Sequence, residues 1–336
     1  MNADRRRIAG VIALLVLIGL LLPSHARVER QQIIDAYPAT VFSLLNDFRR
    51  VAEWAPYTRD DPNARFEIGG SQSGEGATVT WSGRIIGSGR ETISESLPFE
   101  RIVVDIDLGD GRETTRTYAL ERQDGETIVT VSWQRETGLN PLARVFALFQ
   151  DGIRGPDFER DLASLAEFAG NLPRADFGDL EMRRMVVETQ DIAYITTRSL
   201  PEASAMSAAM SESFFDIYDF MDRHSLSRDG APMSITRTFS GSELVFDAAI
   251  PVRGLTSATP RAENAVKTGR TYAGPLIRVR HKGDYGSLAE THRKIAAYLA
   301  ATATERNGDA WESYVSDPEL ADESGLETYL YYPVRN

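Results

Sequence analysis

The sequence IVVDIDLGDGRETTRTYALERQDGETIVTVSW, at residues 102–133, decides the fold of the first half of the chain. Its first residues alternate between two faces, with Ile102, Val104 and Ile106 at every second position, which is typical of a strand with one buried face. Asp110 and Asp124 are each followed by glycine, a two-residue turn signal between strands. The segment before Trp133 is rich in β-branched residues. The stretch therefore predicts an antiparallel meander of hairpin strands.

Segments on either side of this meander predict a strand and several helices. Residues 28–36 read as a strand, and residues 38–46 read as a short helix with Pro38 near its first position. Two apolar helical faces follow the meander, separated by a break at Gly155-Pro156. Their residues are Leu142, Val145, Phe146 and Phe149, then Phe158, Leu162, Leu165 and Ala169. The fold class is therefore α+β, a helix-grip domain in which a curved sheet wraps on a long C-terminal helix and leaves an apolar cavity.

Short motifs in the first half resemble a known family. The motifs are Val28-Glu29-Arg30, Trp54-Ala55-Pro56-Tyr57, Trp81-Ser82-Gly83, Gly87-Ser88-Gly89 and Gly155-Pro156-Asp157-Phe158. Together they resemble the polyketide cyclase/dehydrase-like branch of the SRPBCC (START-like) superfamily. The resemblance implies a ligand cavity in a domain at residues 28–170, but it does not identify the ligand.

Aromatic residues are the candidates for lining that cavity. They are Trp54, Tyr57, Trp81, Trp133 and Phe149. Ordinary core packing is the competing interpretation for each, because aromatic side chains dominate cores. The segment holds no histidine, so it lacks the commonest general base, and no catalytic set is predicted in it.

Residues 171–180 form a polar segment with Pro173 and Gly178, which predicts a linker to a second domain at residues 181–336. That domain contains a diverged repeat: Ile195 and Arg198 recur as Ile277 and Arg280, 82 residues later. Each half reads strand, helix, strand, strand. The first helix carries one apolar face, made by Met206, Met210, Phe214, Ile217 and Met221. We therefore expect a duplicated βαββ domain with a groove between its halves.

The end of the chain resembles a second family. The matching elements are His281-Lys282-Gly283-Asp284-Tyr285, the segment from Trp311 to Pro318, and the segment from Glu327 to Val334. They resemble the GyrI-like, or AraC effector-binding, small-molecule domain. In that family a groove glutamate meets cationic or electrophilic aromatic ligands, and the motif position implies Glu312 for this role. No helix-turn-helix segment accompanies the resemblance.

Aromatic residues surround Glu312 in the sequence. Glu312 and Tyr314 are expected on one face of a strand, and Tyr329 and Tyr331 on one face of the last strand. The expected ligand site also includes Trp311, Tyr285 and Tyr331. A carboxylate amid rings suits a flat cation. The competing interpretation is a solvated edge-strand glutamate beside core tyrosines.

Composition excludes several function classes. The chain of 336 residues has no cysteine, so thiolate nucleophiles, disulfides and cysteine metal sites are excluded. Its net charge of -12 makes it a poor nucleic-acid binder, so none is expected as a partner. The four histidines are dispersed, and neither a metal nor another cofactor is predicted.

The first 27 residues read as a leader. Arg5, Arg6 and Arg7 precede an uncharged run from Ile8 to Leu22. A cleaved signal peptide with its site at Ala26 and an uncleaved membrane anchor both fit this pattern, and a buried core helix is a third interpretation. Both export interpretations place the domains outside the cytoplasm: anchored to the inner membrane by an apolar helix, or free in the periplasm.

Three functions follow from these patterns. The leading hypothesis is an exported or membrane-anchored protein that binds small apolar or cationic molecules. The alternative is a hydrolase of strained electrophiles that uses Glu312 as its base, as some GyrI-like proteins do. An envelope-organising protein without a working pocket is the third. An acid–base partner beside Glu312 separates the first two, and Tyr285 and His292 are the candidates for it.

Overall fold

The computed structural model describes residues 16–17, 19–55, 61–316 and 325–335. They form two compact units. One comprises the described residues up to Gly178 together with Ala296–Ala303, and the other comprises Asp179–Ile295 and the described residues from Thr304. Most of the leader lies outside the described residues, as does Tyr57. Within the described part of the chain, no helix combines the length and apolar character needed to cross a bilayer.

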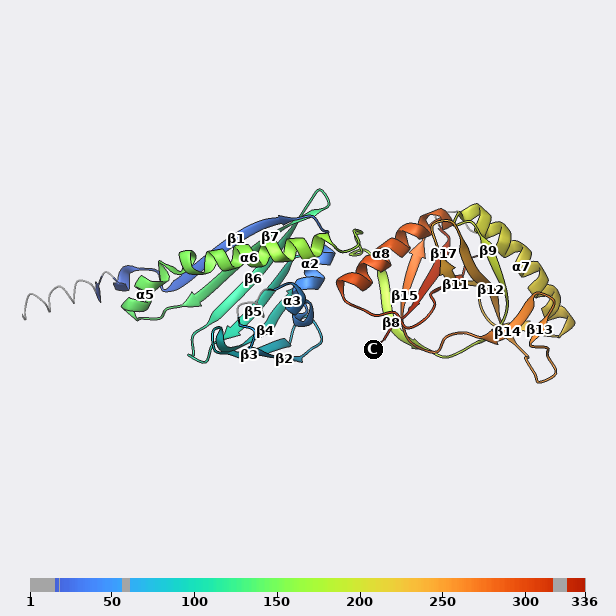
Figure 1. Cartoon of the computed structure of the whole chain (residues 1–336), viewed down its shortest axis with the longest axis horizontal. Helices are drawn as coiled ribbons and strands as arrows, with labels where there is room; N and C mark the ends of the chain where they lie inside the picture. The colour runs from blue at the N-terminus through green and yellow to red at the C-terminus, as the bar shows by residue number, and fades with distance from the viewer. Residues whose placement is uncertain (1–15, 18, 56–60, 317–324, 336) are drawn as a thin grey trace, which may run out of the picture. The chain divides into compact units, whose positions relative to one another are not determined.

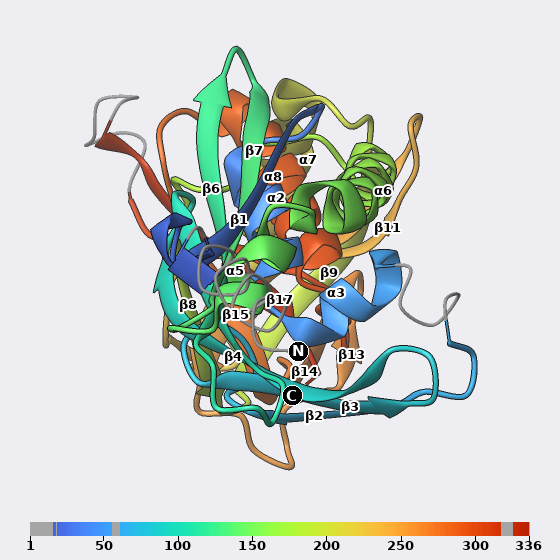
Figure 2. The same cartoon turned by 90° about the vertical axis from the view of Figure 1, so that its left-hand side faces the viewer.

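The first unit contains an antiparallel sheet in the order β1-β7-β6-β5-β4-β3-β2. Figure 2 shows β2 and β3 running across the direction of β6 and β7, so the sheet is strongly curved. The strands are β1 (His25–Ile34), β2 (Arg65–Gly70), β3 (Ala77–Gly83), β4 (Gly87–Leu97), β5 (Arg101–Asp107), β6 (Thr114–Gln123) and β7 (Glu126–Glu136). Ala26 belongs to β1, where it pairs with Arg135 and is 4% exposed.

One of the two predicted turns is confirmed and the other is wrong. Asp124 and Gly125 both have positive φ and join β6 to β7 as a two-residue hairpin turn. Asp110 and Gly111 instead lie inside a longer loop, because β5 already ends at Asp107 and β6 begins only at Thr114. Gly109 and Gly111 both have positive φ there, and together they form a wider turn than one Asp-Gly pair makes.

Helix α6 (Gln150–Gly170) runs along β1 and β7 and closes the helix grip (Figure 1). Its predicted apolar face is confirmed, because Phe158, Leu162, Leu165 and Ala169 are buried in the core of the first unit. The predicted break at Gly155-Pro156 is wrong, since α6 continues through Pro156. Gly155 instead allows the guanidinium of Arg30 to lie close to the helix backbone. A Cβ atom at this position would be 2.0 Å from that guanidinium.

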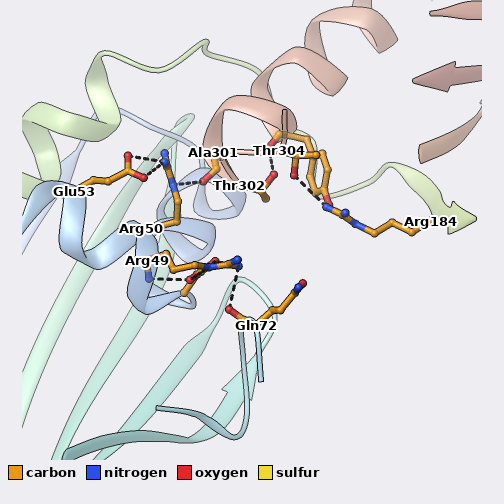
Figure 3. Close-up of polar contacts among 10 residues, drawn as sticks. Arg49, Arg50, Glu53, Gln72, Arg184, Ala301, Thr302 and Thr304 are labelled. Carbon is orange, nitrogen blue, oxygen red and sulfur yellow. Dashed lines mark hydrogen bonds and ion pairs between the residues drawn. The ribbon is translucent and has the colours of Figure 1, made fainter. Parts of the chain in front are cut away.

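Helices α2 (Pro38–Leu45) and α3 (Phe48–Trp54) fill the space beside α6. Asp47 begins α3 by accepting a hydrogen bond from the backbone N–H of Arg49 at 2.9 Å. Figure 3 shows Arg49 reaching the carbonyl of Gln72 and Arg50 donating to Glu53, at 3.2 and 2.6 Å. The first contact holds α3 against the loop between β2 and β3, and the second lies within α3.

The second unit contains an antiparallel sheet of ten strands whose order reflects the repeat. Six central strands run β9-β12-β11-β16-β17-β15, so each half pairs its first strand with its last, and β11 meets β16 at the centre. The strands are β8 (Glu181–Val187), β9 (Asp191–Ser199), β10 (Ser227–Arg228), β11 (Met233–Phe239), β12 (Leu244–Arg253), β13 (Ala262–Glu263), β14 (Val266–Arg270), β15 (Gly274–Lys282), β16 (Trp311–Tyr314) and β17 (Glu327–Pro333). This is the order expected for two βαββ halves.

Each half contributes one long helix, α7 (Ala203–Arg223) or α8 (Leu288–Ala301), the latter preceded by the short 3₁₀ helix η1 (Tyr285–Ser287). Figure 1 shows both helices on the same side of the sheet. The C-terminal part of α7 enters the core, where Ile217 and Met221 pack with residues of β9 and β12. Its N-terminal part, with Met206 and Met210, packs against β12.

Candidate functional site

A cavity of about 990 Å³ lies in the second unit between α7, α8 and the central strands of the sheet. Its apolar wall comes from the N-terminal half of α7, the start of α8, and the strands and loops that face them. Met206 and Met210 give this wall flexible, polarizable side chains that adapt to irregular ligands. The apolar lining residues are Pro201, Met206, Met210, Phe214, Pro232, Phe239, Leu244, Leu288, Ala289, Ala310 and Val315.

Glu312 is the buried charged residue of this cavity. It is 7% exposed and lies on β16, a central strand paired with β11 and β17. Glu312 Oε2 accepts a hydrogen bond from the hydroxyl of Tyr314 at 2.6 Å, and Ser234 Oγ lies 3.2 Å from that hydroxyl. The interpretation of Glu312 as a solvated edge-strand residue is therefore wrong, because its strand is central and its side chain is buried.

His292 of α8 connects Glu312 to the last strand. Its Nε2 lies 2.6 Å from Glu312 Oε1, and its Nδ1 lies 2.5 Å from the hydroxyl of Tyr332. In a neutral imidazole one nitrogen donates and the other accepts. The network is satisfied when Nε2–H donates to Glu312 and Nδ1 accepts from Tyr332. In that arrangement the cluster carries the single negative charge of Glu312.

The two phenols of this cluster hold their protons strongly. Burial and the neighbouring charge of Glu312 raise the pKa of Tyr314 well above its ordinary value. Burial likewise raises the pKa of Tyr332. Both hydroxyls are therefore hydrogen-bond donors over the whole physiological pH range. They stabilise the carboxylate of Glu312 directly, or through His292.

The remaining charged residues that line the cavity are exposed at its rim. They are Glu202, Arg228, Arg293 and Arg306. Arg293 forms an ion pair with Glu290, and the guanidinium of Arg306 lies 5.4 Å from the ring centre of Tyr332. Water and salt screen exposed charges far more than buried ones. Glu312 therefore determines the charge that a ligand meets inside the cavity.

The structure brings some of the predicted site residues together and separates others. Tyr314 and Tyr285 line the cavity with Glu312, and their rings meet edge to face at 5.5 Å. Trp311 and Tyr331 do not line it. They stack on each other at 4.8 Å within a core cluster on the opposite face of the sheet.

Alternation along the strands explains this separation. Neighbouring residues in a strand point to opposite faces, so Trp311 faces away from the side where Glu312 lies. The same alternation brings Tyr332, rather than Tyr331, to the cavity. Tyr332, Ser234 and the methionines of α7 belong to the site although no sequence motif indicated them. The sequence indicated His292 only as one of two possible partners for Glu312.

Most of the first unit matches the model of a known family. Residues 25–170 match the model of the polyketide cyclase/dehydrase and lipid transport family. This match confirms the resemblance of the first half of the chain. No curated protein matches the sequence.

Solved structures similar to this chain share little sequence with it. The crystal structure of the EcmrR C-terminal domain is 12% identical, covers 47% of this chain and 99% of its own, and has a TM-score of 0.41. A hydrolase from Listeria innocua is 14% identical, with coverages of 46% and 91% and a TM-score of 0.34. Ara h 8.0201 is 18% identical, with coverages of 42% and 98% and a TM-score of 0.31.

In the first unit, the predicted cavity residues have different surroundings. Trp54 and Trp133 are buried in the core, and Trp54 Nε1 donates to the carbonyl of Leu44 at 3.3 Å. Trp81 is partly buried and lies against Gly89, whose lack of a side chain leaves room for the ring. Phe149 is 61% exposed, before the start of α6. Packing thus accounts for the three tryptophans.

A small cavity of about 40 Å³ lies in the same unit, beside Tyr37, Thr40 and Ala169. It has room for about one water molecule. None of the described candidates, Trp54, Trp81, Trp133 and Phe149, lines it. Among the described residues, no group of three or more His, Asp or Glu side chains is placed to hold a metal ion.

Proposed function

We propose that this chain is a small-molecule-binding protein whose second unit holds a flat, lipophilic cation against Glu312. The family of the first unit supports small-molecule binding in general. The observation that carries the specific proposal is a single buried carboxylate inside a cavity of about 990 Å³ with a largely apolar wall. Such a volume lies at the upper end of the range for drug-sized ligands.

The cavity favours a cation over a neutral ligand of the same shape for electrostatic reasons. A carboxylate oxygen has two lone pairs, and each oxygen of Glu312 accepts one hydrogen bond within the network. Lone pairs therefore remain to face a positive group. Tyr285 and Tyr314 add ring faces that attract cations. The attraction is stronger in the apolar cavity than in water.

Replacing Glu312 by glutamine tests the proposal because it keeps the shape and removes the charge. The probes are N-methylacridinium and 9-methylanthracene, which share one outline and differ in charge. We expect Glu312→Gln to weaken binding of the cation by about 1–3 kcal/mol, the scale of a hydrogen-bonded contact to a charged group. Binding of the neutral probe should stay nearly unchanged. Fluorescence titration of the full chain measures both.

Glu202→Gln is the matched control, because Glu202 lines the same cavity but is exposed at its rim. This variant should change neither affinity appreciably. If Glu312→Gln weakens both probes equally, the residue acts through folding or shape. If it weakens neither, the cation proposal is wrong.

A hydrolase is the second candidate, and the contact between His292 and Glu312 favours it. In such a reaction Glu312 would take a proton from water, whose oxygen bonds to a carbon of a strained ring. The ring bond breaks, and the ring atom that leaves with the electron pair receives the proton of the Tyr314 hydroxyl, which the protonated Glu312 then restores. The raised pKa of Tyr314 keeps its proton available until that moment.

An aryl epoxide tests this second candidate. A hydrolase should convert it to a diol that contains oxygen from labelled water, detected by mass spectrometry. Glu312→Gln should abolish this turnover and leave binding of the epoxide largely intact. Absence of diol with the unmodified chain would count against hydrolysis of epoxides and leave the binding proposal standing.

A further inference from the structure

Helix α5 (Pro141–Ala147) of the first unit has large apolar side chains exposed on its outer surface. Leu142 is 70% exposed and Phe146 is 66% exposed. Exposed apolar residues elsewhere in this unit are scattered, whereas these follow one another along a short segment. We call this set the α5 surface: Leu139, Leu142, Val145, Phe146, Leu148 and Phe149. Contiguous apolar patches of this kind mark sites of interaction with a protein or a membrane.

The α5 surface carries no charge because its one charged residue points inward. Arg144 is the single ionisable residue between Leu139 and Phe149, and it is 8% exposed. Its guanidinium donates to the carbonyls of Gly138 and Leu22 at 2.9 and 3.0 Å. The guanidinium of Arg144 therefore binds the backbone just before β1, and the outer side of α5 carries no charged group.

The apolar run of the leader reaches this surface directly. Leu20 and Leu21, at the end of the uncharged run Ile8–Leu22, are 39% and 80% exposed. Gly19 lies so close to Pro141 that a Cβ atom on it would be 2.6 Å from the Cβ atom of Pro141. Figure 1 shows the described residues before β1 beside α5. The α5 surface and the end of the leader are thus continuous.

We propose that the α5 surface lies in the apolar interface of a phospholipid bilayer. Exposed leucine and phenylalanine side chains in a segment whose one charged residue is buried suit the boundary between headgroups and acyl chains. The continuous apolar run of the leader makes a bilayer the fitting occupant, because a stretch of that composition favours hydrocarbon over water. An uncharged surface should bind through apolar contact, so ionic strength should have little effect on it. This inference does not rest on the cavity of the second unit.

Single-cysteine labelling tests the proposal, because the chain has no cysteine of its own. Phe146→Cys and Leu142→Cys place an environment-sensitive fluorophore on the α5 surface of the full chain. Phe215→Cys is the control, since Phe215 is 76% exposed on α7 in the other unit. Each labelled chain is mixed with phosphatidylcholine vesicles at low and at high salt.

We expect a blue shift and a several-fold rise in emission at positions 142 and 146, at both salt concentrations, and little change at 215. Bromine-labelled lipids should quench the two labels on the α5 surface. If vesicles bind the chain but leave these labels in water, the leader alone contacts the membrane and the proposal is wrong. A blue shift without vesicles that grows with protein concentration would show that a second copy covers the surface, which also overturns it.

Discussion

Replacing Arg237 by alanine should lower the free energy of unfolding of the second unit by about 2–4 kcal/mol. Arg237 lies on β11 and donates from Nε and Nη2 to Oδ2 of Asp247 at 2.8 and 2.6 Å. Asp247 is 2% exposed, and its Oδ1 has no hydrogen-bond partner among the described residues. Without Arg237 a carboxylate remains buried and uncompensated. The expected loss of unfolding free energy is smaller than for a fully buried ion pair, because the side chain of Arg237 is 41% exposed.

Arg198→Ala is the matched control for this variant. The side chain of Arg198 is 74% exposed, and it meets Glu243 at 3.5 Å on the surface of the same unit. Surface ion pairs of this kind contribute about 0–1 kcal/mol. Urea unfolding of the full chain measures both variants. An effect of Arg237→Ala as small as that of Arg198→Ala would show that Asp247 does not depend on its partner.

Raising the pH above about 10 should destabilise the protein steeply, because several buried tyrosines resist ionisation. Burial raises the pKa of Tyr118 to about 12, and it also raises the pKa values of Tyr314, Tyr331 and Tyr332. In the unfolded chain a tyrosine loses its proton near pH 10. Between that pH and the folded pKa the unfolded state binds fewer protons, so stability falls as pH rises.

The contribution of Tyr118 is present in full below pH 10 and is lost as pH rises through about 12. It amounts to about 3 kcal/mol, from a pKa about two units above the ordinary value. Tyr118→Phe should therefore flatten the fall in unfolding free energy between pH 9 and pH 12. Tyr218→Phe is the control, because Tyr218 is 41% exposed on α7. Equal slopes for Tyr118→Phe and the unmodified chain would contradict the prediction.

The alternation of apolar residues predicted the strands and the buried helix face of the first unit better than the turn and break signals did. The pattern from Ile102 to Ile106 became β5, and the apolar face from Phe158 to Ala169 became the buried side of α6. The helical pattern from Leu142 to Phe149 did mark a helix, but its apolar side faces outward. Periodicity shows that a helix has an apolar face, and it cannot show what covers that face.

The candidate site was harder to predict because its residues come from separate elements. Proximity in sequence placed Trp311 beside Glu312, yet adjacent strand residues point to opposite faces of the sheet. His292 lies 20 positions before Glu312 and reaches it only because α8 packs across the sheet. The alternation predicted that Glu312 and Tyr314 share a face. Which face the helices cover depends on the pairing of β11 with β16, and no local pattern encodes that pairing.

The position of Ala26 within β1 links any processing of the leader to the order of events during folding. A peptidase needs an extended and accessible chain in its active site, and such segments concentrate at exposed loops and termini. Once β1 pairs with β7, Ala26 is opposite Arg135 and inaccessible. A cut after Ala26 would therefore have to precede formation of that strand pair. The rate at which the N-terminal strand joins the sheet would then set the fraction of chains that keep their leader.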